Sequence, residues 1–220
     1  MVVYRFTILG FLCFLLALTS LAQVPQPFQV GGKTGYRSAD GRFFLEPQFE
    51  AGSEFREGFA LVILDKTRYY MDTAGQFLST PELEDAELFY EGLAAVKFAG
   101  RYGFINHQGQ WLIQPIFQQA FGFREGRARV QRNEKWGFLN LKGQLVIPTI
   151  YENADDFSMK LALVQENGLY GYVNSEGALQ IPCRFELASR FQPNGQAEVQ
   201  LNGEFFFIDT TGARVPDRQP

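Results

Sequence analysis

The stretch that decides the fold runs from Gly103 to Trp136 and reads GFINHQGQWLIQPIFQQAFGFREGRARVQRNEKW. It is one copy of a unit that recurs along the chain. The first position of the unit, called the frame position below, falls at Gly35, Tyr69, Gly103, Gly137, Gly171 and Phe206, at intervals of 34, 34, 34, 34 and 35 residues. A fixed period in this range is typical of a repeat architecture, in which stacked units bury a shared core.

Each unit is predicted to contain three strands. In the copy that starts at Gly103, residues 104–106 form the first strand, and a turn from Asn106 to Gly109 follows. Asn favours turn entry, and Gly accepts the positive φ that tight turns need. Residues 110–114 form the second strand, which we expect to end at Pro115 because Pro cannot donate to a ladder. Residues 127–131 alternate small apolar and polar side chains, the pattern of a half-buried third strand.

The connector between the second and third strands carries a phenylalanine twenty positions after each of the first five frame residues: Phe55, Phe89, Phe123, Phe157 and Phe191. We expect these rings to fill the core between units. An alanine recurs at the start of the third strand, which predicts close approach of neighbouring units: Ala60, Ala94, Ala128, Ala162 and Ala197. We expect the connectors, including residues 82–90, to hold at most one or two helical turns.

The prediction is an all-β tandem array of 34-residue, three-stranded antiparallel repeats. Two arrangements fit it. One is an open stack, or solenoid, with atypical terminal copies. The alternative is a small propeller-like ring in which the two ends complete one blade. Propeller blades of four strands usually need about 40 residues or more. A period of 34 residues therefore favours the open stack.

Residues 1–22 precede the repeats and have the layout of a secretory signal peptide. Arg5 lies before an apolar run, and Ala22 ends a small-residue cleavage site. We expect cleavage after Ala22 and export to the periplasm, the cell surface or the medium, with no stable membrane span afterwards. Retention of the segment as an anchor is the alternative, although the run is short for a spanning helix. The repeat array then covers residues 23–216, and residues 217–220 form a tail.

Within this array, Lys135-Trp136-Gly137-Phe138-Leu139-Asn140, with Gly143 and Pro148 after it, resembles the bacterial WG repeat, also called the KWG repeat. The pairs Tyr102-Gly103 and Tyr170-Gly171 look like variants with Tyr for Trp. The resemblance covers roughly residues 28–216, although the second and sixth copies lose the glycine. It implies a tandem β-repeat protein, common in bacteria and often exported, that acts as a binding module. It supplies no catalytic residue.

Composition and motifs argue against nucleic-acid binding, metal binding and catalysis. The formal net charge is −4, and the chain lacks the basic patch that nucleic acid requires. We expect no catalytic, cofactor-binding or metal-binding residue. His107 is the only histidine, and we place it on an exposed turn. A metal site needs several converging ligands. The acidic residues fall in connectors, where solvation is the simpler explanation: Glu82, Glu84, Asp85, Glu87, Asp155 and Asp156.

The sequence thus predicts an exported, non-catalytic module that binds a protein or a component of the cell envelope. A glycan-binding protein that uses exposed aromatic rings is the alternative, and Trp111 is its candidate stacking residue. Trp111 occupies a repeat position that is apolar in most copies, so packing is the stronger interpretation. A hydrolase with spatially paired carboxylates is the third candidate, because the geometry of such a pair is not visible in sequence.

Overall fold

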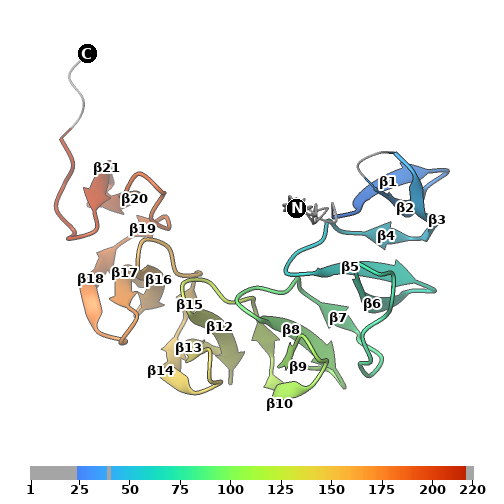
Figure 1. Ribbon diagram of the computed structural model, residues 1–220. Coiled ribbons are helices and arrows are strands. Elements are labelled where there is room, and N and C mark those ends of the chain that lie inside the picture. The colour runs from blue at the N-terminus through green and yellow to red at the C-terminus, as the bar shows by residue number, and fades with distance from the viewer. Residues whose placement is uncertain (1–23, 39–40, 217–220) are drawn as a thin grey trace, which may run out of the picture.

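The computed structural model describes residues 24–38 and 41–216, so the predicted signal peptide and the tail lie outside the described residues. The described residues form twenty-one β-strands in six antiparallel sheets, with no helix among them. Within this part of the chain, nothing has the length and apolarity of a membrane-spanning helix. Figure 1 shows the sheets following one another along an open arc, with the first and last sheets at its two ends. The open array is therefore confirmed.

The three central sheets have four strands each, and each sheet is a meander in chain order. Their strands are β7 (Asp85–Ala86), β8 (Leu93–Phe98), β9 (Arg101–Asn106) and β10 (Trp111–Phe117); β11 (Gln119–Ala120), β12 (Arg127–Arg132), β13 (Lys135–Asn140) and β14 (Leu145–Tyr151); and β15 (Asn153–Ala154), β16 (Leu161–Glu166), β17 (Leu169–Asn174) and β18 (Leu179–Phe185).

The other three sheets have three strands each. They comprise β1 (Gln26–Val30), β2 (Lys33–Arg37) and β3 (Phe43–Phe49); β4 (Ala51–Gly52), β5 (Phe59–Leu64) and β6 (Thr67–Asp72); and β19 (Leu187–Ala188), β20 (Gln196–Leu201) and β21 (Glu204–Asp209). Four strands fit into 34 residues because the first strand of a sheet is only two residues long. That strand comes from the connector, where no strand was predicted and helical turns were allowed.

The prediction that Pro115 ends the second strand was wrong. Strand β10 continues through Pro115 to Phe117, and β11 begins two residues later as the first strand of the next sheet. One stretch of chain therefore closes one sheet and opens the following one. The pairing of β10 with β9 shifts register around the proline, as in a β-bulge. A bulge accommodates proline because the missing N–H is not needed there.

The frame glycine lies against this bulge. A Cβ on Gly137 would lie 2.4 Å from the carbonyl oxygen of Ile147 and 2.7 Å from the carbonyl carbon of Pro148. Gly35, Gly103 and Gly171 meet the same crowding from the backbone of the outer strand, with closest contacts of 2.5–2.7 Å. Any side chain at these positions would displace the outer strand.

The two copies without the glycine show that consequence. Tyr69 holds the frame position of β6, and beyond this strand only the isolated bridges Arg68–Leu83 and Met71–Phe77 remain. Phe206 holds it in β21, and there the bridge from Ile208 to Arg214 is the remnant. Both sheets lack an outer strand among the described residues. The frame glycine thus accompanies an outer strand, which is present in the four sheets that have it and absent from the two that do not.

The core consists of five hydrophobic clusters, one between each pair of neighbouring sheets. Each recurrent phenylalanine of the connector contacts the aromatic ring one position after the frame residue of its own copy. Their ring centroids lie 4.7–5.4 Å apart in the pairs Phe55–Tyr36, Phe89–Tyr70, Phe123–Phe104, Phe157–Phe138 and Phe191–Tyr172. The recurrent alanines lie in the same clusters, fully buried. Both sequence expectations are confirmed.

Candidate functional site

The aromatic residues of the repeat signature pack inside the array. Trp136 is 8% exposed, and its ring lies 5.9 Å from the ring of Phe121 and 5.5 Å from the guanidinium of Arg129. Nε of Arg129 forms an ion pair with Asp156 at 2.7 Å. The Tyr102 hydroxyl donates to a carboxylate oxygen of Asp85 at 2.6 Å. Tyr170 packs partly buried between the last two sheets. These side chains hold sheets together.

Trp111, the predicted stacking residue, is half-buried at the start of β10. It packs against the cluster between the second and third sheets, and its ring centroid lies 6.4 Å from that of Phe98. A Cβ on Gly103 would lie 2.8 Å from the edge of the indole ring. The protein therefore already contacts much of the ring. A ligand-stacking role for Trp111 stays a prediction.

A ladder of glutamates joins successive copies along the array. Glu57 accepts hydrogen bonds from the backbone N–H groups of Glu91 and Gly92 at 2.7 and 2.9 Å. Glu91 accepts one from Gly126 at 2.8 Å. Glu125 accepts two from the next copy, from Met159 and Lys160, at 3.1 and 2.7 Å.

The N–H groups that the ladder binds belong to tight turns in which both central residues have positive φ. In one of these turns, φ is 51° at Glu125 and 76° at Gly126. The recurrent Glu-Gly pair therefore has a structural role. Its glycine relieves strain in its own turn, and its carboxylate fixes the turn of the next copy.

His107 is half-buried, although the sequence analysis placed it on an exposed turn. Its Nε2 atom lies 3.2 Å from a carboxylate oxygen of Glu57, two copies earlier. Its ring also packs on Phe89 and Phe59, with centroid distances of 4.7 and 5.4 Å. Within the described residues, no three His, Cys, Asp or Glu side chains come together as metal ligands. His107 thus acts as a side-chain contact between copies.

Three tyrosines, each one position after a frame residue, join the strand that carries the frame residue to the connector by a hydrogen bond. The hydroxyls of Tyr36, Tyr70 and Tyr172 donate to the backbone carbonyls of Ser53, Glu87 and Ser189. Burial raises the pKa of Tyr36 to about 12, and it raises the pKa of Tyr70 and Tyr172 as well. These groups stay neutral and serve as hydrogen-bond donors.

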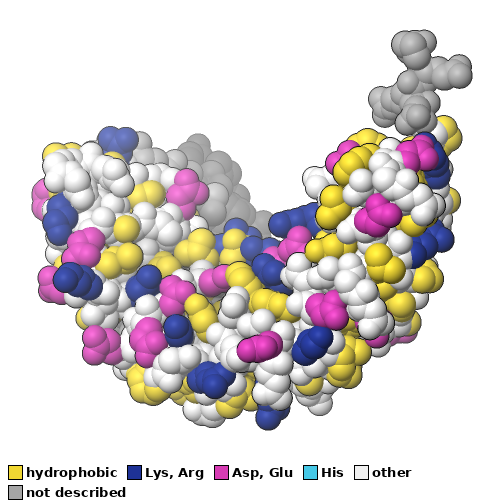
Figure 2. All heavy atoms as spheres, turned by 180° about the vertical axis from the view of Figure 1, so that it is seen from behind, with side chains coloured by type: hydrophobic (Ala, Val, Ile, Leu, Met, Phe, Trp, Pro, Cys, Tyr) yellow, Lys and Arg dark blue, Asp and Glu magenta, His cyan; other side chains and the backbone are white. Residues whose placement is uncertain are grey.

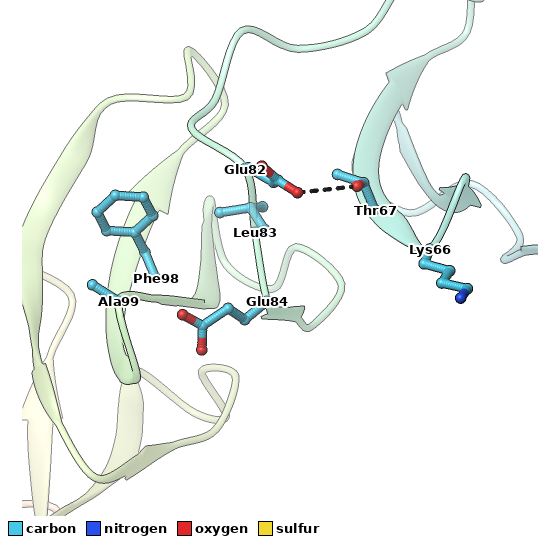
Figure 3. A pocket seen from close by; sticks show the side chains of 7 residues that line it. All are labelled: Lys66, Thr67, Glu82, Leu83, Glu84, Phe98 and Ala99. Atoms are coloured by element: carbon cyan, nitrogen blue, oxygen red, sulfur yellow. Dashed lines mark hydrogen bonds between the residues drawn. The ribbon is translucent and has the colours of Figure 1, made fainter.

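The predicted acidic residues separate into two sets. Glu82 and Glu84 line an open pocket of about 390 Å³ with Thr67, Phe98 and other residues of the second and third sheets. Figure 3 shows Glu82 directed towards Thr67, with Lys66 pointing away from both glutamates. The Glu82 carboxylate accepts a hydrogen bond from Thr67 at 3.4 Å.

The other acids make contacts within the array. Asp85 pairs with Arg68, Asp155 with Arg190, and Asp156 with Arg129. Glu87 accepts a hydrogen bond from the Gly122 N–H at 2.8 Å, and burial raises its pKa. The structure therefore does not bring all six acids into one cluster.

A second pocket, of about 520 Å³, lies between the third, fourth and fifth copies. Glu125, Phe157, Lys160 and Ser175 line it. The glutamate is the last carboxylate of the ladder, because Met159 holds the equivalent position in the next copy. This site was not predicted from the sequence. The signal that could have found it lies four positions after the frame residue, where the third, fourth and fifth copies have His107, Leu141 and Ser175, so that a small side chain follows two large ones.

The C-terminal sheet exposes a face that the other sheets bury. In β13, Trp136 and Phe138 face the next sheet and are 8% and 0% exposed. Phe205 and Phe207 hold the same positions in β21 but are 55% and 45% exposed. Figure 2 shows the molecule as a crescent on which acidic, basic and hydrophobic side chains are mixed. The two phenylalanines thus form an unpaired apolar face at one end of the arc.

Comparisons with known proteins agree with the repeat architecture. Hsv2 of Kluyveromyces lactis, a propeller-like structure, aligns with a TM-score of 0.50 and 9% identity over 86% of this chain and 72% of its own. A eukaryotic initiation factor aligns with a TM-score of 0.56 and 13% identity over 90% of this chain and 63% of its own. At such identities the likeness concerns the fold alone. No curated protein sequence matches the chain.

One protein-family model matches the chain repeatedly. The WG containing repeat matches residues 35–67, 70–102, 102–136, 136–170 and 170–205 in tandem. These matches start within two residues of the frame and signature positions, and they cover most of the chain. The protein therefore belongs to the family of WG containing repeats.

Proposed function

We propose that the protein is an exported, non-catalytic protein-interaction module, and that its binding surface is the open face of the C-terminal sheet. The exposure of Phe205 and Phe207 carries the proposal, because the equivalent side chains of the preceding copies are packed against a neighbouring sheet. Large exposed apolar groups on one face favour a protein partner. The repeat architecture also supports a binding role, because such arrays present extended surfaces that are used for recognition.

The occupant that fits this face is the N-terminal sheet of a second copy. In β1 and β2, Phe28 pairs with Gly35 as Val130 pairs with Gly137 in the fourth sheet. Phe28, Val30, Lys33 and Arg37 therefore share the face that, in later copies, packs on the preceding sheet. Val30 is 60% exposed. The array thus offers complementary faces at its two ends.

The charges of the two end faces are opposite. Glu198, which pairs with Phe207, and Asp209 lie on the C-terminal face. Hydrogen bonds from Thr211 lower the pKa of Asp209, which keeps it ionised. Lys33 and Arg37 lie on the N-terminal face. Complementary charges steer association and fix its orientation. Contact between unlike ends forms a ring when the rotation closes and a filament when it does not.

Sedimentation over a dilution series tests this assignment. The protein should associate in a concentration-dependent way that weakens with added salt. The double variant Phe205→Ser/Phe207→Ser should remain monomeric. The double variant Ile116→Ser/Ile150→Ser changes side chains that are 49% and 54% exposed on outer strands, and it should associate like the wild type. A wild-type protein that stays monomeric at all concentrations would contradict self-association through this face.

Charge-swapped copies provide the specificity control. Glu198→Lys and Arg37→Glu should each weaken self-association, whereas an equimolar mixture of the two variants should associate through the restored pair.

Export of the protein is tested separately. Mass spectrometry of the protein from fractionated cells should find Gln23 as the first residue, and an intact N-terminus would support the anchored alternative.

A glycan is the second candidate ligand, favoured by the pocket in Figure 3. Phe98 is 38% exposed beside the carboxylates of Glu82 and Glu84, and aromatic rings with polar acceptors suit sugars. A glycan array should then give hits that Phe98→Ala and Trp111→Ala remove. An array without hits would count against this candidate and against the related hydrolase.

A further inference from the structure

In two copies, the residue four positions after the frame residue lies beside a ladder glutamate two copies earlier. His107 is the clearest case, since its imidazole meets the Glu57 carboxylate and the Phe89 ring. Shifting each of these residues by two periods gives Glu125, Phe157 and Ser175. Three of the four residues that line the 520 Å³ pocket are therefore the repeat equivalents of the His107 contact.

Ser175 leaves this second place open because its side chain is much smaller than an imidazole. The carboxylate and the aromatic ring of the His107 contact are both present here, as Glu125 and Phe157. Glu125 accepts the two backbone N–H groups of its neighbouring turn, as Glu57 does. At the closed site, one oxygen of Glu57 binds both the Gly92 N–H and the His107 ring. The Glu125 carboxylate can bind a further N–H in the same way.

We propose that this pocket is a binding site for an imidazole ring supplied from outside the chain, held as the His107 ring is held at the closed site. The ring would donate an N–H to the carboxylate of Glu125 and pack on the ring of Phe157. The pocket has room for the ring, and the molecule itself shows the geometry of the contact at the equivalent position.

Two basic residues distinguish the open site from the closed one. Lys160 replaces Gly92 at the rim. Arg127 replaces Phe59, and its guanidinium donates to the carbonyl oxygen of Ser175 at 3.0 and 2.7 Å. A planar guanidinium can lie against the face of an aromatic ring. Arg127 can thus take the packing role that Phe59 has beside His107.

Titration with imidazole, followed by the backbone amide NMR signals, tests the site. The experiment is run at a pH of about 8, where a ring with the ordinary histidine pKa of about 6.5 is neutral. Saturable shifts should appear at Met159, Lys160 and Ser175. Because 1-methylimidazole has no N–H to donate, it should bind about ten-fold more weakly. Absence of saturable shifts with imidazole would overturn the proposal.

Three variants complete the test. Ser175→His should fill the pocket, abolish imidazole binding and raise the melting temperature. Glu125→Gln should weaken binding about ten-fold, because a charged acceptor is replaced by a neutral one. His107→Ser should open the equivalent site beside Glu57 and raise the number of imidazole sites from one to two. Unchanged binding in Ser175→His, in a variant whose amide spectrum shows a folded protein, would refute the assignment.

Two further probes, free histidine and histidine capped as N-acetyl-histidine amide, show whether the ring comes from a peptide or from a small molecule. If histidine capped as N-acetyl-histidine amide binds as well as imidazole, the site takes a histidine side chain of a peptide. If imidazole and free histidine bind but the capped form does not, the site takes a small molecule. Both results support the pocket as an imidazole site. If none of the three compounds binds, the proposal is refuted.

Discussion

At the scale of single residues, the frame glycine has the sharpest structural requirement in this chain. Gly137 lies under the carbonyl oxygen of Ile147, in backbone that belongs to the bulge of β14. A backbone contact cannot be relieved by rotating a side chain. The copies with Tyr69 and Phe206 at this position keep their other strands but lose the outer one. The glycine is therefore needed for the outer strand rather than for the repeat itself.

Gly137→Ala should consequently destabilise the protein by about 1–3 kcal/mol, the usual cost of overpacking. Denaturant unfolding measures the change, and hydrogen exchange should show the lost protection in β14 first. Lys135→Ala, on the same strand, is the control and should stay within about 0.5 kcal/mol of the wild type. A neutral Gly137→Ala variant would disprove the close contact.

The buried tyrosines predict a loss of stability in alkaline solution. The pKa of Tyr36 is about 12 in the folded protein against 10.0 for an unperturbed tyrosine, and burial also raises those of Tyr70 and Tyr172. A raised pKa means that the folded state holds its proton longer than the unfolded state does. The stabilising contribution is complete below pH 10 and is lost as the pH rises towards 12.

Stability measured by denaturant unfolding should therefore fall between about pH 10 and pH 12. Tyr36→Phe should reduce the slope of this fall, because the variant has one titrating group fewer. Tyr90→Phe is the comparison, at a half-buried tyrosine whose ring lies between Arg56 and Arg124. An equal slope in wild type and Tyr36→Phe would contradict the assignment.

At the scale of elements, each sheet is joined to the next by a hydrophobic cluster. Carboxylates of the ladder also join the second to fifth sheets. Four of the two-residue strands are short because they only continue the outer strand of the previous sheet: β4, β11, β15 and β19. The ladder glutamates are exposed, so each contributes less than a buried charge would.

Glu91→Ala should cost about 1 kcal/mol, because the Gly126 N–H loses its charged acceptor. A double-mutant cycle with Glu57→Ala should show coupling, since Glu57 binds the turn that contains Glu91. Glu176→Ala changes an exposed turn residue outside the ladder and should be close to neutral. Additive effects of the two ladder variants would show that neighbouring turns are independent.

At the scale of the whole molecule, the array is quasi-one-dimensional, because the hydrophobic clusters form only between neighbouring sheets. The central sheets have a neighbour on both sides, and the first and last sheets have one. In such arrays, stability is close to a sum of repeat and nearest-neighbour contributions.

Hydrogen exchange should therefore show least protection in β1–β3 and β19–β21 and most in the sheets that contain β9 and β13. Phe104→Ala should lower protection in the third and fourth sheets, which share its cluster. Ile208→Ala should lower it in the last two sheets only. Uniform protection along the chain would mean that the array unfolds as one cooperative unit.

The repeat and its core were readable from sequence because they depend on local periodicity. Alternation in residues 127–131 predicted β12, and the recurrent phenylalanines predicted the clusters between sheets. The passage of β10 through Pro115 was missed, because a bulge is defined by its partner strand. His107 was misplaced for a similar reason, since its contact with Glu57 spans 50 residues.

The sequence by itself determined the all-β class, the period, the family and the side chains that fill the core, because these follow from turn chemistry and apolar spacing within one copy. The tertiary structure decided which surfaces stay open. Ser175 leaves a pocket and Phe207 an unpaired face only because of what other copies place, or fail to place, beside them. Such vacancies depend on contacts between copies, and no single copy contains them.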